Sequence, residues 1–314
     1  MTPTGPGATR ARLWLLLLLI PVALLVYIAA YSRWVANKPA PQIAQPLEFI
    51  VPPPAPLEAA PPAPTVIAVA PAPAGVSQQT FAPPKAFAAT VVRQVRLPAG
   101  AKLIALTFDD GPWPVTTQED LDILRRYNAR ATFFWVGRYL RAYPKIAQQV
   151  ILDGHAVGNH SWSHLYHPFT PAAAAQELDS TSSLITQDTE VSTRLFRPPG
   201  GSLKNGLASY ALKQGYTVVM WSVSSADTDP KAPWTAFAAN VLNGARPGAI
   251  VLMHDGGGNR SRTTRALPVI LEGLQKQGYR FVTIPELLEA AQSGPALQQA
   301  HTNPAPHRSS LAGH

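Results

Sequence analysis

Two adjacent carboxylates, Asp109 and Asp110, follow a short apolar run and precede Gly111 and Pro112. Two neighbouring negative charges at the end of a strand repel each other unless a cation or a proton separates them. An Asp-Gly-Pro sequence is also common in ordinary turns and helix caps. Taken alone, the pair is therefore as consistent with a turn as with a cation site.

A histidine pair, His160 and His164, lies further along the chain in the sequence HSWSH. The spacing of four predicts that both imidazoles lie on one face of a helical turn, the arrangement that two metal-binding histidines need. The flanking His155 and His167 fall outside this register. Because the chain has no Cys, thiolate nucleophiles and Cys-ligated zinc are excluded. One carboxylate and two histidines would leave open positions on a metal, as catalytic sites do.

Three further polar segments follow apolar runs. Arg197 begins the sequence RPPGG, whose prolines and glycines predict a rigid loop with a backbone that can approach a ligand closely. Asp227 and Asp229 lie in the second segment, and His254 begins the third. A histidine at a strand end beside carboxylates is a candidate general acid. Each loop alone is consistent with an ordinary turn, but five at successive strand ends indicate a site.

Apolar, strand-like runs alternate with segments of helical periodicity. The predicted strands are Lys102–Phe108, Ala131–Val136, His155–Gly158, Arg194–Arg197, Thr217–Trp221, Ala249–Met253 and Arg280–Ile284. The predicted helices are Gln118–Tyr127, Tyr139–Leu152, Pro171–Thr189, Leu203–Gln214, Trp234–Leu242, Arg262–Gln277 and Pro285–Ala291. This alternation predicts a parallel sheet built of βα units. In such sheets the carboxyl ends of the strands form the site, which would bring the polar segments together.

The number of strands bounds the architecture. About seven strands are slightly few for an eight-fold barrel. We therefore expect an α/β fold, a distorted and incomplete (β/α) barrel of about seven strands, with a doubly wound open sheet as the alternative.

The region before this pattern differs in composition. Leu13 to Tyr31 has no charged residue over about the length that spans a bilayer as a helix. A cleaved signal peptide is the alternative, but Ile28–Tyr31 is a poor cleavage site. We expect a cytoplasmic N-terminus and transmembrane anchor over 1–38, a Pro/Ala-rich extended spacer over 39–98, a catalytic domain over 99–292 and a disordered tail over 293–314. The expected location is the cytoplasmic membrane, single-pass, with the catalytic domain outside.

The formal net charge is +8, with 26 basic and 18 acidic residues. Arg260, Arg262 and Arg265 gather in one segment. No basic run interleaved with aromatic residues is present, so the sequence does not support nucleic-acid binding. A positive surface suits an acidic polymer or an anionic membrane, although the charge can equally serve solubility alone.

From Lys102 to about Leu288 the chain resembles the polysaccharide deacetylase family, carbohydrate esterase family 4. The resemblance is carried by the sequences TFDDG (107–111), HSWSH (160–164), RPPGG (197–201) and LMH (252–254), in the family's order and spacing. It implies a distorted (β/α) barrel. It also implies metal-dependent hydrolysis of N-acetyl groups on an aminosugar polymer, with release of acetate.

The resemblance implies roles for the first group of polar residues. Asp109 corresponds to the catalytic base, and Arg197 to the residue that orients it. Asp110, His160 and His164 correspond to the metal ligands. Zinc is the first expectation for the metal, and cobalt, nickel or manganese would suit the same ligands.

The resemblance also implies roles for residues later in the chain. His254 corresponds to the general acid and Asp227 to its acidic partner, a role for which Asp229 competes. Gly200 corresponds to the residue whose backbone N–H binds the oxyanion. Leu252 corresponds to the residue that lines the acetyl pocket.

Three positions depart from the family pattern. Gly200 stands where Tyr is frequent, Ser224 where Asp is usual and Thr228 where Trp is usual. Because Thr is much smaller than Trp, we expect a wider and wetter acyl pocket unless Trp162 or Trp234 fills the space.

The expected partners follow from these residues and from the anchor. They are an N-acetylated aminosugar polymer of cell-wall or exopolysaccharide type, and the cytoplasmic membrane through the N-terminal helix. Two alternatives remain open: an inactive, anchored glycan-binding protein, and an O-acetyl esterase on the same scaffold.

Overall fold

The structure, a computed structural model, describes residues 80–293. The expected membrane anchor, most of the expected spacer and the C-terminal tail lie outside the described residues. Within residues 80–293, no helix combines the length and the apolar character that crossing a membrane requires.

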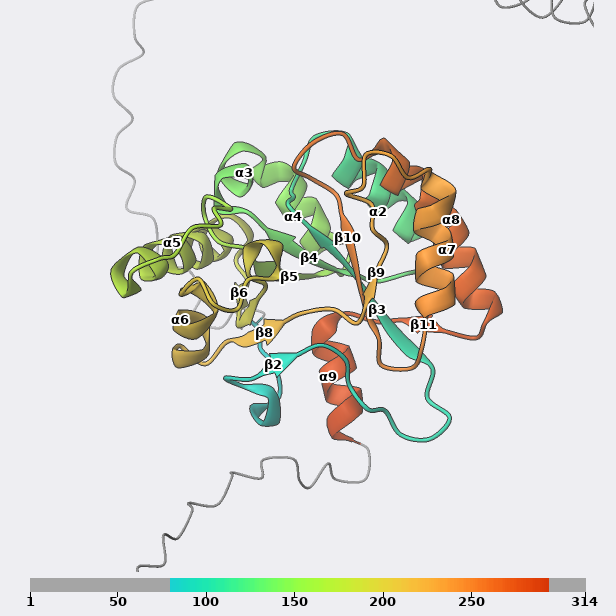
Figure 1. Ribbon diagram of the computed structural model, residues 1–314, viewed down its shortest axis with the longest axis horizontal. Helices are drawn as coiled ribbons and strands as arrows, with labels where there is room; N and C mark the ends of the chain where they lie inside the picture. The colour runs from blue at the N-terminus through green and yellow to red at the C-terminus, as the bar shows by residue number, and fades with distance from the viewer. Residues whose placement is uncertain (1–79, 294–314) are drawn as a thin grey trace, which may run out of the picture. The chain divides into compact units, whose positions relative to one another are not determined.

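Within the described residues, nine strands form one curled sheet in which every pair is parallel (Figure 1). Across the sheet they are β2 (Val91–Val92), β8 (Thr217–Val219), β7 (Leu195–Phe196), β5 (Ala156–Asn159), β4 (Thr132–Trp135), β3 (Leu103–Asp109), β10 (Ile250–His254) and β9 (Val223–Ser224). The ninth, β11 (Arg280–Phe281), pairs with the start of β3. Each of the seven predicted strands has a counterpart among these.

The sheet curls until its two ends approach each other. β8 and β9 are adjacent in the chain, separated by residues 220–222, yet they lie near opposite ends of the pairing order. The N–H of Ser222 donates to the carbonyl oxygen of Ile250 in β10. Gln94, just after β2, forms an isolated bridge with Ala249. The predicted incomplete barrel is therefore confirmed, and the doubly wound open sheet is not what is observed.

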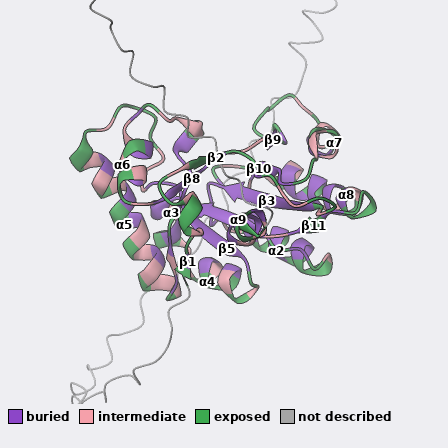
Figure 2. Cartoon of the chain, turned by 90° about the horizontal axis from the view of Figure 1, so that it is seen from below, coloured by how far each residue is buried: buried purple, intermediate pink, exposed green. Residues whose placement is uncertain are grey.

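Helices pack around the strands, with buried faces inward and exposed faces outward (Figure 2). They are α2 (Thr116–Arg126), α3 (Gly137–Ala142), α4 (Pro144–Leu152), α5 (Pro171–Thr189), α6 (Leu207–Lys213), α7 (Trp234–Gly244), α8 (Ser261–Lys276) and α9 (Ile284–Gln292), with 3₁₀ turns η1 (Lys85–Phe87) and η2 (Pro199–Gly201). The single helix predicted over Tyr139–Leu152 is divided at Tyr143. Tyr143 has φ −133° and ψ 52°, because the ring of Pro144 disfavours helical backbone at the residue before it.

The folded unit begins earlier than the boundary predicted at residue 99. β1 (Thr80–Phe81) pairs with β6 (Ser192–Thr193), and β2 pairs with β8. The side chains of Phe81, Val92 and Val95 are buried. Residues 80–98 therefore belong to the folded unit and not to the spacer. Two-residue strands are too short to establish a periodicity, and the Pro-rich composition conceals them.

The alternation of side chains along β3 separates a core from a site. Leu103 and Ala105 pack inside the barrel with residues of α9, whereas the even-numbered residues of β3 pack beneath the outer helices. Thr107 and Asp109 share the inward-facing positions, because successive side chains of a strand point to opposite faces. Apolar residues of α9 complete this interior core, and polar side chains lie at the carboxyl end of the barrel.

Candidate active site

A cavity of about 500 Å³ lies at the carboxyl ends of the strands. Among its lining residues are the predicted site residues Asp109, Asp110, His160, His164, Gly200, Leu252 and His254. Arg197 and Asp227 are buried behind them and contact Asp109 and His254. The structure thus brings together every site residue that the sequence predicted.

Arg197 holds Asp109 in place from inside the barrel. Its side chain is completely buried, and its Nη1 donates to Oδ1 of Asp109 at 2.6 Å and to Oγ1 of Thr107 at 2.8 Å. Nε donates to the carbonyl of Val219 at 2.9 Å, and Nη2 to that of Met220 at 3.3 Å. Burial lowers the pKa of Arg197, and the carboxylate of Asp109 opposes this effect. All three guanidinium nitrogens are engaged, so the orientation of Asp109 is well determined.

Asp110, His160 and His164 form a candidate metal centre. Each residue offers one ligand atom, and these atoms lie within 4.8 Å of one another. Oδ1 of Asp110 is 3.0 Å from Nε2 of His164 and 3.5 Å from Nε2 of His160. Burial acts to raise the pKa of Asp110, but the two imidazoles outweigh this effect and hold that pKa well below its ordinary value.

The three residues fit a bound metal. Oδ1 of Asp110 is buried and has no hydrogen-bond partner among the described residues, although two imidazole nitrogens face it. Tetrahedral zinc, with bonds of about 2.0–2.1 Å, places its ligand atoms about 3.3 Å apart. The observed separations lie on either side of that value, so this orphaned oxygen and the two nitrogens match a metal-binding set.

The backbone of Arg197 fixes the ring of His160. Nδ1 of His160 lies 2.7 Å from the carbonyl oxygen of Arg197. A carbonyl only accepts hydrogen bonds, so Nδ1 carries a proton and Nε2 is the ring nitrogen that could bind a metal. Hydrogen bonds of this kind orient most metal-binding histidines.

The helical turn predicted for His160 and His164 is wrong. The segment is a loop, in which Ser161 has φ 67° and His164 has φ 56°, both in the left-handed region. The two imidazoles nevertheless come together, with ring centroids 5.0 Å apart. The spacing therefore identified the pair correctly but not the backbone that joins it.

Glu177 on α5 explains why this loop is not helical. Its Oε2 accepts the backbone N–H groups of Trp162 and Ser163 at 2.9 and 2.8 Å, and its Oε1 accepts the Ser163 hydroxyl at 2.7 Å. Asn159 accepts the N–H of Ser161 at 2.8 Å. These carboxylate and amide groups replace the hydrogen bonds of a helix. Sequence reasoning missed Glu177, because its backbone partners lie 14 and 15 residues away and leave no local pattern.

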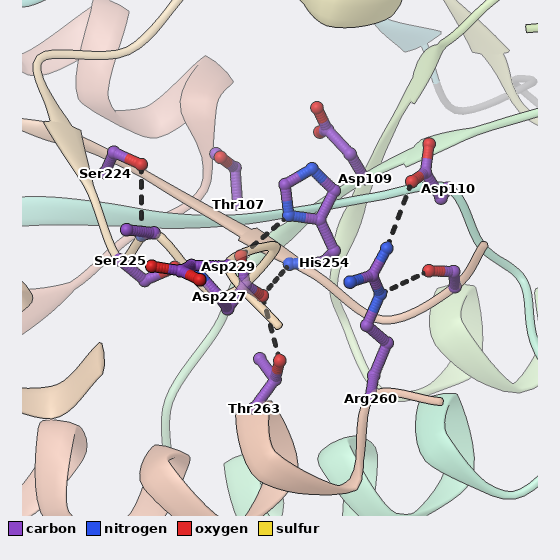
Figure 3. A network of polar contacts seen from close by, with 12 residues as sticks. Thr107, Asp109, Asp110, Ser224, Ser225, Asp227, Asp229, His254, Arg260 and Thr263 are labelled. Carbon is purple, nitrogen blue, oxygen red and sulfur yellow. Dashed lines mark hydrogen bonds and ion pairs between the residues drawn. The ribbon is translucent and has the colours of Figure 1, made fainter. Parts of the chain in front are cut away.

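His254, which is partly buried, forms a pair with the buried Asp227 (Figure 3). Nδ1 of His254 lies 2.8 Å from Oδ1 of Asp227, and Oδ2 of Asp227 accepts the backbone N–H of His254 at 2.8 Å and the Thr263 hydroxyl at 2.9 Å. Asp229 is exposed, and its Oδ1 accepts the N–H of Lys231 instead. Asp227 is therefore the partner of His254.

The pair shifts the proton affinity of both members. Burial acts to lower the pKa of His254, but the hydrogen bond and charge of Asp227 outweigh it and raise that pKa above 6.5. Burial acts to raise the pKa of Asp227, and the His254 and Thr263 hydrogen bonds outweigh it, so that pKa is lowered. His254 therefore retains its proton to higher pH than a free imidazole, which suits a general acid.

Three aromatic side chains that the sequence did not predict line the cavity, namely Tyr139, Tyr166 and Trp221. A Cβ atom at Gly200, which has φ 61°, would lie 2.7 Å from Cε1 of Tyr166, so Tyr166 takes the space of a side chain at 200. Trp221 also lines the cavity, and its ring lies against Gly201. Trp162 and Trp234, the candidates named from sequence, instead pack against Arg141 and Arg265. Which aromatic rings reach the cavity depends on contacts that form only in the folded chain. No pattern in the sequence therefore distinguished Tyr166 and Trp221 from Trp162 and Trp234.

Comparison with known proteins places this site in a family. A family model described as polysaccharide deacetylase matches residues 96–219. The chain is 41% identical over 193 residues to a peptidoglycan-N-acetylglucosamine deacetylase of Bacillus cereus, covering 61% of this chain and 91% of that protein. The chain belongs to the polysaccharide deacetylase family. It is a hydrolase of the polysaccharide N-deacetylase class.

Further members show the same relation. The chain is 35% identical over 207 residues to a chitooligosaccharide deacetylase of Azorhizobium caulinodans, covering 60% of this chain and 96% of that protein. The chain also matches a peptidoglycan N-acetylglucosamine deacetylase whose crystal structure was determined in complex with a benzamide ligand. The two sequences are 29% identical and the two folds superpose with a TM-score of 0.60, over 64% of this chain and 94% of that one.

The family also includes a protein described as a pseudoenzyme. The sequence of this Bacillus anthracis protein is 28% identical to that of the present chain. The two structures superpose with a TM-score of 0.57, over 63% of this chain and 68% of that one.

Proposed function

We propose that this protein is a metal-dependent deacetylase that hydrolyses N-acetyl groups on an aminosugar polymer and releases acetate. The observation that carries the proposal is the convergence of Asp109, Asp110, His160, His164 and His254 around one cavity. Relatives named as deacetylases of peptidoglycan N-acetylglucosamine and of chitooligosaccharides support this substrate class.

Asp110, His160 and His164 would hold the metal, and zinc suits this set of one carboxylate and two imidazoles best, with cobalt, nickel or manganese as alternatives. A divalent metal bound there supplies Lewis-acid polarisation of the acetamide carbonyl and lowers the pKa of water. The chain's own contribution is to orient the ring of His160 through the carbonyl oxygen of Arg197, and to hold the loop between His160 and His164 through Glu177.

Asp109 acts as the general base. It accepts a proton from the water that attacks the acetamide carbonyl carbon, and its orientation is set by Arg197 at 2.6 Å. The backbone N–H of Gly200 donates to the oxyanion that develops on the carbonyl oxygen. Leu252 lines the cavity and provides an apolar contact for the acetyl methyl group.

His254 acts as the general acid. Its Nδ1 is engaged by Asp227, which leaves Nε2 as the nitrogen available to the cavity. The protonated imidazole donates a proton to the sugar nitrogen as the carbon–nitrogen bond breaks. The products are acetate and a free amine on the sugar, and the proton accepted by Asp109 balances the one that His254 donates.

Acetate release tests the proposed function. We expect the purified protein to release one acetate for each new free amine on N-acetylglucosamine oligomers. Removing divalent metal with a chelator should abolish the release, and added zinc should restore it. Metal-loaded protein that binds these oligomers without releasing acetate would support the glycan-binding alternative. Release from O-acetyl xylan alone would support the esterase alternative.

We also propose that residues 13–31 anchor the protein in the cytoplasmic membrane with the catalytic domain outside. The uncharged segment and the Pro-rich stretch after it support this proposal. Protease added to intact spheroplasts should then remove the domain, whereas a cytoplasmic marker protein stays intact. Deletion of residues 1–38 should move the activity to the soluble fraction. Protection of the domain from external protease would contradict the topology.

Thr228 is expected to affect the choice of acyl group. It is exposed and lines the cavity, so it leaves room that a Trp would fill. We expect wild type to remove propionyl as well as acetyl groups, and Thr228→Trp to lower the propionyl-to-acetyl ratio of kcat/KM by about tenfold. Thr228→Val is the control, because it removes the hydroxyl without adding bulk. If wild type already rejects propionyl as strongly as Thr228→Trp does, Trp221 or another side chain closes the pocket.

A further inference from the structure

Arg260 is a cation in the cavity with unused hydrogen-bonding capacity. Its side chain is only 15% exposed, and its Nε donates to the carbonyl of Gly256 at 2.7 Å. Nη2 forms a long ion pair with Oδ2 of Asp110, at 3.9 Å, which is beyond hydrogen-bond distance (Figure 3). Within residues 80–293, neither terminal nitrogen of Arg260 has a hydrogen-bond partner, whereas Arg197 uses all three of its nitrogens. Arg260 is thus placed to bind a group that the chain does not supply.

The stability of α8 does not account for Arg260. It lies at the N-cap of α8, whose first turn has no acidic residue. A cation at that end faces the positive end of the helix dipole, which is unfavourable. Two neighbouring arginines have structural roles instead: Arg262 donates to the carbonyl oxygens of residues 229, 230 and 232, and Arg265 stacks on Trp234. Of the three, Arg260 lines the cavity.

Arg138 is a second cation at the same cavity. It lies on α3, after β4, whereas Arg260 follows β10, so the two approach from strands on either side of β3. Arg138 is exposed and its Nη2 donates to the hydroxyl of Tyr139 at 3.0 Å. In the described part of the chain it has no carboxylate within ion-pair distance. Among the described residues, Arg138 forms no ion pair and Arg260 forms only a long one with Asp110, so both guanidinium groups can attract an anion into the cavity.

We propose that Arg260, assisted by Arg138, binds a carboxylate carried by the substrate glycan, so that an acidic aminosugar polymer is preferred to a neutral one. The proposal rests on the proposed function, because it concerns the substrate of the same site. A guanidinium pairs with a carboxylate through parallel N–H···O bonds, and the free terminal nitrogens of Arg260 suit this geometry. The carboxylate belongs either to the sugar, as on a lactyl ether, or to a peptide attached to it.

Four substrates of equal length test the proposal. They are a neutral N-acetylglucosamine oligomer, an oligomer in which alternate sugars carry a lactyl carboxylate, the same oligomer with that carboxylate converted to an amide, and the same oligomer with a peptide attached. We expect wild type to favour the free carboxylate over its amide by about tenfold or more in kcat/KM. The peptide-bearing oligomer identifies which source of carboxylate is preferred.

Arg260→Gln should bring the carboxylate-to-amide ratio toward one, and Arg138→Gln should reduce it in part. Arg265→Gln is the matched control, because it removes the same charge from α8 at an exposed position outside the cavity, and should keep the ratio. Zinc affinity, measured by titration, should be the same in Arg260→Gln and wild type.

Three outcomes would overturn the proposal. Equal kcat/KM on carboxylate and amide in wild type would refute carboxylate recognition while leaving the deacetylase function intact. Weaker zinc binding in Arg260→Gln, with all four substrates affected alike, would make Arg260 a positioning residue for Asp110. If no oligomer releases acetate, the proposed function fails. In that case, the affinity of the lactyl oligomer, measured by calorimetry, tests the carboxylate site independently of catalysis. Equal affinity in wild type and Arg260→Gln would refute the carboxylate site.

Discussion

Asp109→Asn is expected to lower kcat for acetate release by about 10²–10⁴-fold, the usual contribution of a general base. The amide cannot take a proton from water, but its oxygen can still accept the hydrogen bond from Nη1 of Arg197. The metal ligands Asp110, His160 and His164 are unchanged, so bound metal should stay stoichiometric. Acetate release and metal content should be measured on the same preparation.

The control for this variant is Asp229→Asn, which makes the same change at an exposed position whose carboxylate contacts Lys231. It should retain wild-type turnover. Because Arg197 is buried beside Asp109, thermal unfolding of both variants has to be compared with wild type. A folded, metal-loaded Asp109→Asn protein with wild-type kcat would assign the base to another residue.

Asp110→Ala is expected to lose bound metal and with it all measurable turnover. Mutations that only disturb the residues behind a metal ligand weaken binding by about 10–100-fold, so loss of a ligand should weaken it by more than about 100-fold. The remaining His160 and His164 supply two imidazoles and no negative charge. Metal content after dialysis and a zinc titration of the chelated protein measure the effect.

Asp122→Ala is the matched control, since Asp122 lies on α2 with its carboxylate exposed and paired with Arg125. Its metal affinity should equal that of wild type. Stoichiometric metal in Asp110→Ala, at unchanged affinity, would show that the metal lies elsewhere and would remove Asp110 from the ligand set.

Much of the site could be predicted because parallel strands end at one edge. Asp109, Arg197 and His254 each stand at or just after the end of a buried strand. Apolar runs separated by helical segments are visible in the sequence, and their carboxyl ends must meet once the sheet forms. The two-residue alternation of a strand then places Thr107 and Asp109 inside the barrel with Leu103 and Ala105.

Contacts between distant segments could not be predicted in the same way. Asp227 and Asp229 are two residues apart and chemically identical, and the choice between them depends on Thr263 and the backbone of His254. The loop from His160 to His164 departs from a helix because of Glu177 on α5. Neither arrangement leaves a periodic signal near the residue it affects.

The amino-acid sequence by itself determined the βα succession, the absence of thiol chemistry and the residue types that meet at the strand ends. Those properties depend on local periodicity and composition, which every segment carries within itself. Only the tertiary structure decided that Trp221 and Tyr166 line the cavity, that the folded unit begins before residue 99, and that Arg260 lies in the cavity while Arg265 does not. These three features depend on packing, because segments that are far apart in the chain have to come together before their side chains can line one cavity.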